Sequence, residues 1–334
     1  MYRFCGLNTH SRIFLAPLAG FSDAGFRALC AENGAGVTYT EMLSAKGMCY
    51  MSPGTEALLY RDGNDPDCIA QIFGSEPEFM RRAAADERLA SFPAIDINMG
   101  CPVRKVFSNG DGSALMHKPE LIRDVVAAVV EGSGRPVTVK IRAGIKQGQT
   151  LAVECALAAQ EGGASAVCVH PRYREQMYGG VADHEVTAAV KAAVSVPVIA
   201  SGDITDARSY LQVKAKSHAD FFMIGRGALG KPWIFGALNE VERLSETVGD
   251  ERALAESGEI FSEHSSRFNA LDAVKRHIEI LLRILPPRAV ANSMKMHLCH
   301  YAKNTRRAKE VRMAVAKATS VEDIVAIAER YFTA

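Results

Sequence analysis

The sequence predicts an α/β fold, a (β/α)8 barrel followed by a C-terminal all-helical domain. Over residues 1–240, short apolar runs rich in β-branched residues alternate with longer amphipathic stretches. This alternation is typical of parallel strands that are covered on both faces by helices. After Phe235 the alternation ends, and the remaining residues show helical periodicity alone.

Eight segments have the length and composition of buried parallel strands. They are residues 13–16, 37–40, 69–73, 94–98, 137–141, 166–169, 198–200 and 221–224. Helical stretches between them cover residues 24–33, 78–89, 120–130, 150–160, 183–194 and 205–216. A doubly wound open sheet is the alternative, but it usually places a glycine-rich turn after the first strand. Here that turn is Pro17-Leu18-Ala19-Gly20, which lacks the G-x-G-x-x-G pattern, so the barrel is favoured.

The length of 334 residues exceeds that of one ordinary domain. We expect the barrel over residues 1–240, a linker over 241–260 and a helical domain over 261–334. The linker is predicted from the polar stretch 246–259, which reads as linker or loose helix. Helices are expected at residues 267–284, 290–303, 308–317 and 321–332, with Pro286-Pro287 between the first two.

Composition excludes several classes of protein. Hydrophobic residues make up 48% and charged residues 23%, which excludes disorder for most of the chain. No apolar run reaches the roughly 18–20 residues that span a bilayer, and no signal peptide is predicted at the N-terminus, so we expect a cytoplasmic protein. None of the eight cysteines forms a C-x-x-C pair, so no metal site is predicted. The net charge of +1 leaves a nucleic-acid partner open.

Polar residues and glycines gather where the predicted strands end, which is where a (β/α)8 barrel carries its active site. In chain order they are Gln71, Asn98, Lys140, Arg142, His170, Arg172, Ser201, Gly202, Asp203, Gly225 and Arg226. The loops after the last two strands contain glycines that let backbone N–H groups approach a ligand, and Arg226 adds a positive charge. These loops predict a phosphate site; the alternative is that the glycines serve only tight turns.

Three side chains near this edge have more than one interpretation. Lys140 is expected to point into the barrel mouth, where it could neutralise a reduced cofactor ring, form a Schiff base or pair with a carboxylate. Gln71 can offer a donor and an acceptor to a planar heterocycle, or serve the structure alone. His170 could donate to a phosphate or to a ring.

Cys101 lies in a loop between Gly100 and Pro102 rather than on an apolar periodic face. A free thiol with a pKa near 8.5 is mostly protonated at neutral pH, so it can donate a proton to carbon. Nearby Arg104 and Lys105 also leave a thiolate nucleophile open. Both interpretations make Cys101 the candidate catalytic residue.

These segments resemble those of the tRNA-dihydrouridine synthases, FMN-dependent enzymes that reduce uridine in tRNA, and most closely the bacterial B-type branch. The matching segments include Ala16–Gly20, Gln71–Gly74, Asp96–Pro102, Val139–Arg142, Val169–Arg172 and Ile224–Ala228. The Asn-x-Gly-Cys-Pro block is the most specific of them, whereas the phosphate loops alone indicate only a flavin-binding barrel. The resemblance covers most of the chain and is loose after Phe261.

The resemblance implies a role for each matching position. Cys101 would be the general acid that protonates C5 of uridine while reduced FMN gives hydride to C6. FMN contacts are implied for Pro17, Leu18, Ala19, Gln71, Lys140 and His170, with phosphate contacts at Ser201, Gly202, Asp203, Gly225 and Arg226. The family usually has Asn at position 201, so we expect weaker or rearranged FMN contact at Ser201 and not its loss. Gly is common in the family at position 171, where Pro171 is expected to stiffen the loop. NADPH is implied as the reductant, and it would enter at the flavin face because no dinucleotide fingerprint is present.

The substrate side is implied by the same resemblance together with charge. Asn98, Arg142 and Arg172 are expected to hold the uracil edge or a phosphate. Between residues 288 and 317 there are eight basic residues and one acidic residue, and among them Lys295, Arg306 and Arg307 are candidate tRNA contacts. A solvated helix face is the alternative for this basic segment. A monomer is expected.

Three other functions remain open from the sequence. An FMN barrel dehydrogenase acting on a free pyrimidine would also use a loop cysteine, but it would not need the basic segment. A Schiff-base lyase would use Lys140 without flavin. A non-catalytic RNA-binding protein is disfavoured by the presence of Cys101, Lys140 and Arg226 together.

Overall fold

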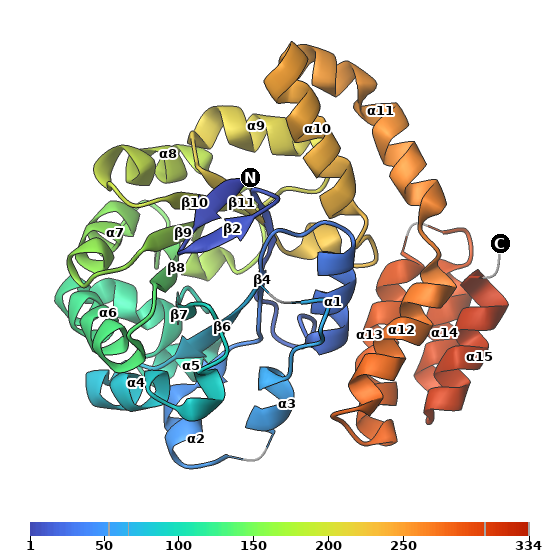
Figure 1. Cartoon of the computed structure of the whole chain (residues 1–334), viewed down its shortest axis with the longest axis horizontal. Helices are drawn as coiled ribbons and strands as arrows, with labels where there is room; N and C mark the ends of the chain where they lie inside the picture. Colours follow the sequence, from blue (N-terminus) through green and yellow to red (C-terminus); the bar gives the residue numbers. More distant parts are fainter. Residues whose placement is uncertain (53, 66, 304, 333–334) are drawn as a thin grey trace.

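The computed structural model describes residues 1–52, 54–65, 67–303 and 305–332, so the last two residues of the expected helical domain lie outside the described part. In the described residues eight parallel strands form the predicted barrel, and a ninth, β5 (Leu43–Ser44), pairs in parallel with the third of them in chain order (Figure 1). The eight barrel strands are β3 (Ile13–Leu15), β4 (Thr38–Tyr39), β6 (Cys68–Phe73), β7 (Ile95–Met99), β8 (Val137–Gly144), β9 (Ala166–Tyr173), β10 (Val198–Ser201) and β11 (Phe221–Ile224). The strand order around the sheet runs from β3 through β11 to β4. The barrel closes where the amide of Leu15 in β3 donates to Val37 O, and the amide of Gly36 donates to Ile13 O, just before β4 begins.

Helices lie between the strands and cover the outside of the barrel. The principal ones are α1 (Ala24–Glu32), α4 (Pro77–Ala84), α6 (Pro119–Ser133), α7 (Ala152–Glu161), α8 (His184–Ala193), α9 (Ala207–Ser217) and α10 (Ile234–Val248). Asp23 caps α1 by accepting a hydrogen bond from the Phe26 amide, and proline occupies the first turn of α4 and α6. The (β/α)8 prediction is confirmed.

The sequence did not predict an N-terminal hairpin of β1 (Tyr2–Phe4) and β2 (Leu7–Thr9). Its Phe4 ring packs against the rings of Phe14 and Phe221, with centroids 4.9 and 5.0 Å apart. Both partners lie at or near the starts of barrel strands, so the hairpin covers the N-terminal end of the barrel. Each hairpin strand has a polar residue at its centre, so neither shows the continuous apolar run that marks the barrel strands.

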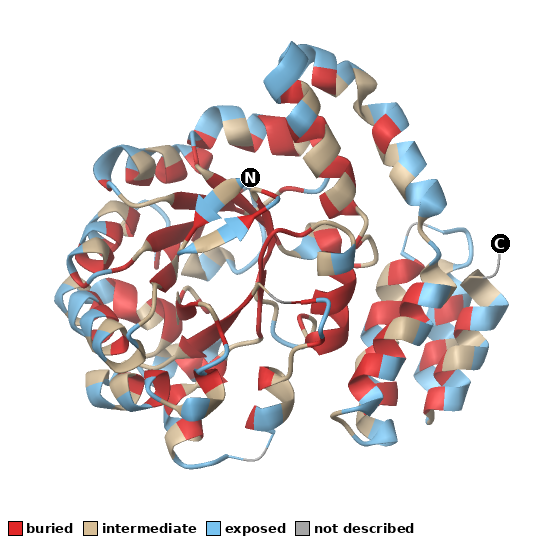
Figure 2. Cartoon of the chain, in the orientation of Figure 1, coloured by how far each residue is buried: buried red, intermediate tan, exposed pale blue. Residues whose placement is uncertain are grey.

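The linker expected over residues 241–260 is instead part of two helices. Helix α10 continues to Val248, Gly249 has a φ of 91°, and α11 covers Asp250–Arg267. Ala253 and Ile260 of α11 are buried in the barrel's hydrophobic core. The stretch looks polar in sequence because most of α11 faces solvent, as its largely exposed surface in Figure 2 shows.

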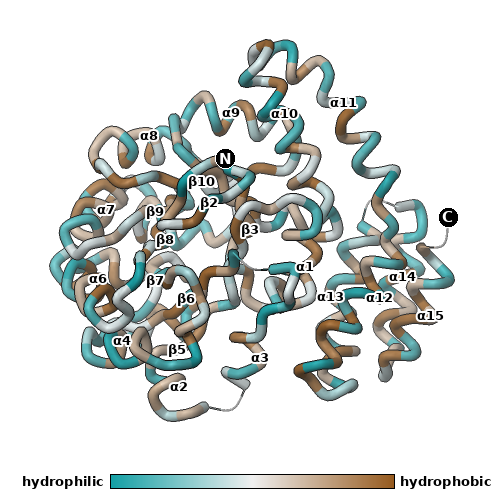
Figure 3. The backbone as a smooth tube through the Cα atoms, viewed as in Figure 1, coloured by the Kyte–Doolittle hydropathy of each residue, from teal (hydrophilic) through white to brown (hydrophobic). Residues whose placement is uncertain are grey.

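The C-terminal helices form a separate group beside the barrel. They are α12 (Ala270–Leu282), α13 (Pro287–Tyr301), α14 (Ala308–Lys317) and α15 (Val321–Phe332), close to their predicted positions. Apolar residues of these helices face one another and form their own core. Figure 3 shows hydrophobic and hydrophilic stretches alternating along these helices. Leu29 of α1 joins this core, so α1 connects the helical group to the barrel. None of the helices in the described residues is long and apolar enough to span a membrane.

A buried polar cluster lies where α1 meets the helical group. His277 Nε2 is 2.7 Å from Asp23 Oδ1, His297 Nε2 is 3.6 Å from Asp23 Oδ2, and Ser293 Oγ donates to the same Oδ2 at 3.2 Å. Both imidazoles are buried. Residues 254 or more positions apart in sequence make these contacts, so spacing could not reveal them. The cap of a barrel helix is thus also an attachment point for the helical domain.

Candidate active site

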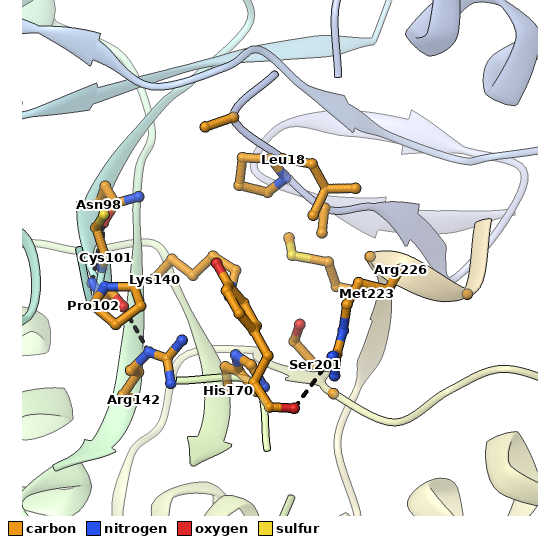
Figure 4. A pocket seen from close by; sticks show the side chains of 18 of the residues that line it. Leu18, Asn98, Cys101, Pro102, Lys140, Arg142, His170, Ser201, Met223 and Arg226 are labelled. Carbon is orange, nitrogen blue, oxygen red and sulfur yellow. Dashed lines mark hydrogen bonds between the residues drawn. The ribbon is translucent and has the colours of Figure 1, made fainter. Parts of the chain in front are cut away.

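A cavity of about 380 Å³ opens at the C-terminal ends of the barrel strands (Figure 4). The hairpin covers the other end, so the cavity lies on the face where barrels of this type carry their active sites. Fourteen of the residues expected at the site line it: Pro17, Leu18, Ala19, Gln71, Asn98, Cys101, Lys140, Arg142, His170, Ser201, Gly202, Asp203, Gly225 and Arg226. Arg172 and the three basic residues expected to contact tRNA do not line it.

Cys101 belongs to the loop that follows β7 and lies on the cavity wall, with 9% of its surface exposed. Burial raises the pKa of its thiol, against the opposing effects of a hydrogen bond from the Val103 amide and the charge of Arg142. The thiol therefore stays protonated at neutral pH. A protonated thiol facing a cavity can act as a proton donor, whereas a thiolate nucleophile would need the opposite shift.

The loop that carries Cys101 is held by the side chain of Asn98. Its Oδ1 accepts hydrogen bonds from the amides of Gly100 and Cys101, at 3.1 and 2.9 Å, and its Nδ2 donates to Gln71 Oε1 at 2.9 Å. Gln71 Nε2 in turn donates to Asp96 at 2.7 Å. Asn98 thus bonds both Gln71 and the loop, and Gln71 bonds both Asn98 and Asp96.

Lys140 lies on β8, and its side chain extends toward the middle of the cavity (Figure 4). Within the described part of the chain its ammonium makes no hydrogen bond or ion pair. Its charge acts to lower the pKa of the buried Asp96 carboxyl, although burial has the larger effect and raises that pKa. A direct carboxylate pair, which the sequence left open, is not present among the described residues.

Arg142 is buried and donates only to backbone carbonyls. Nε bonds Gly100 O at 2.7 Å, and Nη1 bonds Met177 O at 2.9 Å and Tyr173 O at 3.3 Å. Burial lowers the pKa of its guanidinium to about 10, a value at which it still carries its charge at neutral pH. Arg142 therefore ties the Cys101 loop to the loop after β9 and adds positive charge to the cavity wall.

The expectation that Arg172 contacts substrate is not supported by its position. Its side chain is buried, with 2% exposed, and Nη2 donates to both carboxylate oxygens of Asp203 at 2.7 and 2.8 Å. Nε and Nη2 also bond the carbonyls of Gly179 and Gly180. Arg172 points into the protein because its hydrogen-bond donors are satisfied there.

His170 faces the cavity with a defined protonation state. Its Nε2 lies 3.1 Å from Arg172 Nη1, and because arginine can only donate, Nε2 must be the acceptor. Burial, together with the charges of Lys140 and Arg142, lowers the pKa of His170 well below its ordinary value. The ring is therefore neutral, and its proton is on Nδ1.

The two glycine-containing loops lie side by side, because β10 pairs with β11. A Cβ on Gly202, whose φ is 118°, would come within 2.9 Å of the His170 ring, so only glycine fits there. The Asp203 carboxylate accepts from Ala182 N and from Arg172, and its Oδ1 lies 3.8 Å from Arg226 Nη2, so its charge is offset by two guanidinium groups. Arg226 keeps half of its side chain exposed and donates to Tyr178 O at 3.2 Å. These loops offer backbone amides, the Ser201 hydroxyl and one guanidinium.

Several residues that line the cavity were not predicted. They are Met42, Val103, Tyr178, Thr205, Met223 and Lys303, among others. Tyr178 lies between two guanidinium groups, 5.6 Å from that of Arg142 and 5.2 Å from that of Arg226. It follows a three-residue turn in a loop, where no periodic pattern marks it. Met42, Val103 and Thr205 could have been found from the sequence, because each lies shortly after the end of a predicted strand.

The basic segment of residues 288–317 reaches the edge of the cavity. Lys303 lines the cavity although it belongs to the helical domain. Arg306 is exposed, and Lys295 on α13 is partly exposed. Arg307 is partly engaged, because it donates to Arg330 O and its guanidinium lies 4.6 Å from the Tyr331 ring centre. Positive charge therefore continues from the cavity mouth onto the helical domain.

Comparison with known proteins agrees with these observations. A model of the dihydrouridine synthase (Dus) family matches residues 14–333. The tRNA-dihydrouridine synthase B of Xanthomonas axonopodis pv. citri is 36% identical over 326 residues, which cover 97% of this chain and 93% of that protein. The protein of the same name from Pectobacterium carotovorum is 40% identical over 237 residues, covering 71% of this chain and 73% of that one.

Solved structures support the fold alone. A histamine dehydrogenase from Rhizobium sp. 4-9 superposes with a TM-score of 0.54 at 14% identity, over 75% of this chain. The present chain spans about half of that dehydrogenase, since the match covers 48% of its length. Together, the barrel, the cysteine-bearing cavity and a family match over nearly the whole length show that this chain belongs to the dihydrouridine synthase family.

Proposed function

We propose that the protein is a tRNA-dihydrouridine synthase that reduces the C5–C6 double bond of uridine in tRNA, with FMN in the cavity and NADPH as the reductant. The curated relatives carry this name and match up to 97% of the chain. The resemblance that the Asn98–Pro102 block carries points to the same activity.

The cavity wall fits a flavin with a phosphate tail. The Lys140 ammonium and the Ser201 hydroxyl both line it, and neither makes a hydrogen bond to a described residue. Lys140 and His170 Nδ1–H are donors suited to the polar edge of the ring, and Gln71 has a second amide hydrogen to offer. The Gly202 and Gly225 loops with Arg226 suit the phosphate. Bound and reduced, FMN supplies the hydride that C6 of uridine accepts.

Cys101 supplies the second half of the reduction. The C4 carbonyl withdraws electrons from the C5–C6 bond, so hydride addition at C6 leaves negative charge at C5. The Cys101 S–H bond breaks as the new C5–H bond forms, and a solvent proton later restores the thiol. The raised thiol pKa keeps this proton in place until it is needed. General acids of this kind contribute ~10²–10⁴-fold to the rate.

Arg142 and Lys140 support this step electrostatically. Arg142 holds the Cys101 loop through Gly100 O, and its positive charge faces the cavity, where anionic groups of the RNA would enter. Lys140 would offset negative charge that develops on the ring system at the barrel mouth. Both effects are stronger at the partly buried cavity wall than they would be in open water.

The helical domain is the proposed grip on the tRNA. A uridine must leave its stack to reach a cavity at the end of a barrel, so the enzyme needs contacts with the flanking backbone. Lys303 stands at the cavity mouth, and exposed Arg306 follows it. Positive charges next to the mouth suit phosphates on either side of the extruded nucleotide.

The observation that carries the proposal is a cavity that combines a protonated cysteine, a lysine without a partner among the described residues and a basic rim from a second domain. The decisive experiment has two parts. Purified protein should be yellow with flavin absorption near 370 and 450 nm (approximate positions for any flavin), and tRNA from a deletion strain should lack dihydrouridine at one or more positions, restored by the wild-type gene but not by Cys101→Ala. Colourless protein that cannot be loaded with FMN, or an unchanged dihydrouridine map, would exclude the function.

A free pyrimidine is the alternative substrate, and the same protein tests it. If uracil or uridine oxidises the reduced protein as fast as tRNA does, and high salt leaves the tRNA rate unchanged, the basic rim is not used. We expect no measurable turnover with the free base and a strong dependence on salt with tRNA.

A further inference from the structure

We propose that Asp96 is a positioning residue whose carboxylate fixes the orientation of two successive side-chain amides, Gln71 and Asn98, and thereby holds the loop that presents the Cys101 thiol. This inference rests on the proposed function, in which that thiol delivers a proton. Asp96 itself does not line the cavity, so it acts through the other two residues.

The chain of contacts starts in the barrel interior. Asp96 lies on β7 and is 1% exposed. Its Oδ1 accepts from Thr138 Oγ1 at 2.5 Å, and its Oδ2 accepts from Gln71 Nε2 at 2.7 Å. An ionised carboxylate can only accept hydrogen bonds. It therefore selects the amide orientation of Gln71 in which the nitrogen points toward it.

The orientation of the Gln71 amide in turn fixes the orientation of the Asn98 amide. With Gln71 Nε2 turned to Asp96, Gln71 Oε1 must face Asn98, and it accepts from Asn98 Nδ2 at 2.9 Å. Asn98 Oδ1 is then left to face the loop, where it accepts the amides of Gly100 and Cys101. Each side chain has one orientation that satisfies both of its neighbours.

The opposite orientation fails at the last link. If Gln71 turned over, its nitrogen would face the nitrogen of Asn98, and Asn98 would have to turn as well. Its amide nitrogen would then point at the N–H groups of Gly100 and Cys101, leaving two backbone donors without an acceptor. Backbone donors left without a protein acceptor at this part-buried wall make the opposite orientation unfavourable. Because the Asp96 carboxylate can only accept hydrogen bonds, it excludes this opposite orientation of the Gln71 and Asn98 amides.

The surroundings of Asp96 favour this role over simple packing. A buried carboxylate is costly, and burial raises the pKa of Asp96 to about 6 in spite of the hydrogen bonds from Gln71 and Thr138 and the charge of Lys140. At neutral pH the group is still mostly ionised, so it remains acceptor-only. A neutral residue of similar size would pack equally well but would not impose a direction.

The reactivity of Cys101 provides a test that needs neither flavin nor RNA. FMN-free protein is treated with iodoacetamide at pH 8, and the alkylation rate of the peptide containing Cys101 is followed by mass spectrometry. In Asp96→Ala we expect at least a 5-fold faster rate, because the loop is no longer held in its buried position. Thr138→Val is the matched control, since it removes the other hydrogen bond to the same carboxylate. We expect its rate to stay within 2-fold of wild type.

A double-mutant cycle separates positioning from general loosening. If Asp96 acts through Asn98, then Asp96→Ala should add nothing to the alkylation rate in an Asn98→Ala background. If the two substitutions each raise the alkylation rate and their effects multiply in the double variant, the inference is overturned. A wild-type alkylation rate in Asp96→Ala itself would also overturn it. Thermal melting monitors folding of each variant. Should Asp96→Ala not fold, Asp96→Asn takes its place, with an expected increase of at least 2-fold and a wild-type rate counting against the inference.

The outcome is distinguishable from failure of the proposed function. Faster alkylation in the Asp96 variants would stand even if the protein modified no tRNA. Conversely, an active enzyme with an unchanged Cys101 rate in these variants would leave the proposed function intact and exclude the positioning role.

Discussion

Arg172 Nη2 donates to both carboxylate oxygens of Asp203, at 2.7 and 2.8 Å. This pair connects the end of β9 to the turn after β10. It holds and partly neutralises the Asp203 carboxylate, which lies on the cavity wall 3.8 Å from the Arg226 guanidinium, and Arg172 Nη1 at the same time fixes the tautomer of His170. The Arg172 guanidinium thus fixes both the Asp203 carboxylate and the His170 ring, which lie on the cavity wall.

Replacing Arg172 with Met should therefore weaken FMN binding without removing any proposed FMN contact. The freed Asp203 carboxylate would repel the phosphate, and His170 could shift its proton to Nε2. We expect the FMN dissociation constant to rise at least 10-fold, in keeping with the ~1.5–3 kcal/mol typical of hydrogen bonds to charged groups. Flavin fluorescence quenching measures it. An unchanged constant would mean that the pair has no influence on the phosphate loop.

Gly202→Ala should have a similar effect for a steric reason. The new methyl group would lie 2.9 Å from the His170 ring and 3.0 Å from Ala182 Cβ, and the φ of 118° disfavours any side chain. We expect FMN binding to weaken at least 10-fold. Gly148→Ala is the control, because its φ of 82° is also unfavourable but no atom lies within 4 Å of the new methyl group. It should lose some stability and keep wild-type FMN affinity, as a titration would show.

The salt dependence of tRNA binding tests the basic rim. Arg306→Glu should lower tRNA affinity and reduce the slope of log K against log salt by ~0.7–0.9 for each phosphate that the protein no longer neutralises. Arg307→Glu should have less effect, since Arg307 is engaged with Arg330 O and the Tyr331 ring. Arg123→Glu on α6, half exposed on the outside of the barrel, is the control. Equal losses of affinity in the Arg306 and Arg123 variants would show a charge effect without a site.

The cluster at Asp23 predicts a loss of stability in acid. Burial opposes ionisation of Asp23, but its interactions with His277 and His297 lower its pKa well below the ordinary value, and burial lowers that of His297. His297 is therefore neutral in the folded state and binds a proton on unfolding below about pH 6.5, so stability falls as pH drops from there. Asp23 contributes stability above its unfolded pKa of about 3.9, and that contribution is lost as pH falls further.

Melting temperatures of the FMN-free protein from pH 8 to pH 4 measure this effect. Asp23→Asn keeps a good helix cap but removes the charge, and we expect it to cost ~1–3 kcal/mol at pH 7. The control is Asp206→Asn at the exposed cap of α9, which should stay within about 0.5 kcal/mol of wild type. A melting temperature that does not fall toward pH 4 would contradict the assignment.

The barrel could be predicted because its signals are local. Short β-branched runs marked the eight strands, and prolines or capping residues marked the helix starts, as Asp23 and Pro119 illustrate. The hairpin at Tyr2–Thr9 could not be predicted because its strands, Tyr2–Phe4 and Leu7–Thr9, contain polar residues and lack the continuous apolar run that marks the barrel strands. The stretch that α11 occupies could be read from the sequence only as a linker or a loose helix, because only Ala253 and Ile260 are buried along it.

Site composition could be predicted, but side-chain direction could not. The strand-end rule placed Lys140, His170 and Cys101 at the cavity. The same rule wrongly placed Arg172, because sequence position does not show that Asp203 and two carbonyls pull the guanidinium inward. Tyr178 and the Asp23 cluster were missed, since the first lies in a loop and the second joins residues distant in sequence.

The central claim is that the Cys101 thiol protonates the substrate, and single-turnover kinetics test it most directly. Wild-type and Cys101→Ala proteins are loaded with FMN, reduced without oxygen and mixed with tRNA from a deletion strain, and flavin reoxidation is followed at 450 nm (approximate flavin maximum). We expect Cys101→Ala to reoxidise ~10²–10⁴-fold more slowly, while NADPH reduces its flavin at the wild-type rate. Reoxidation of the variant as fast as wild type would contradict the account.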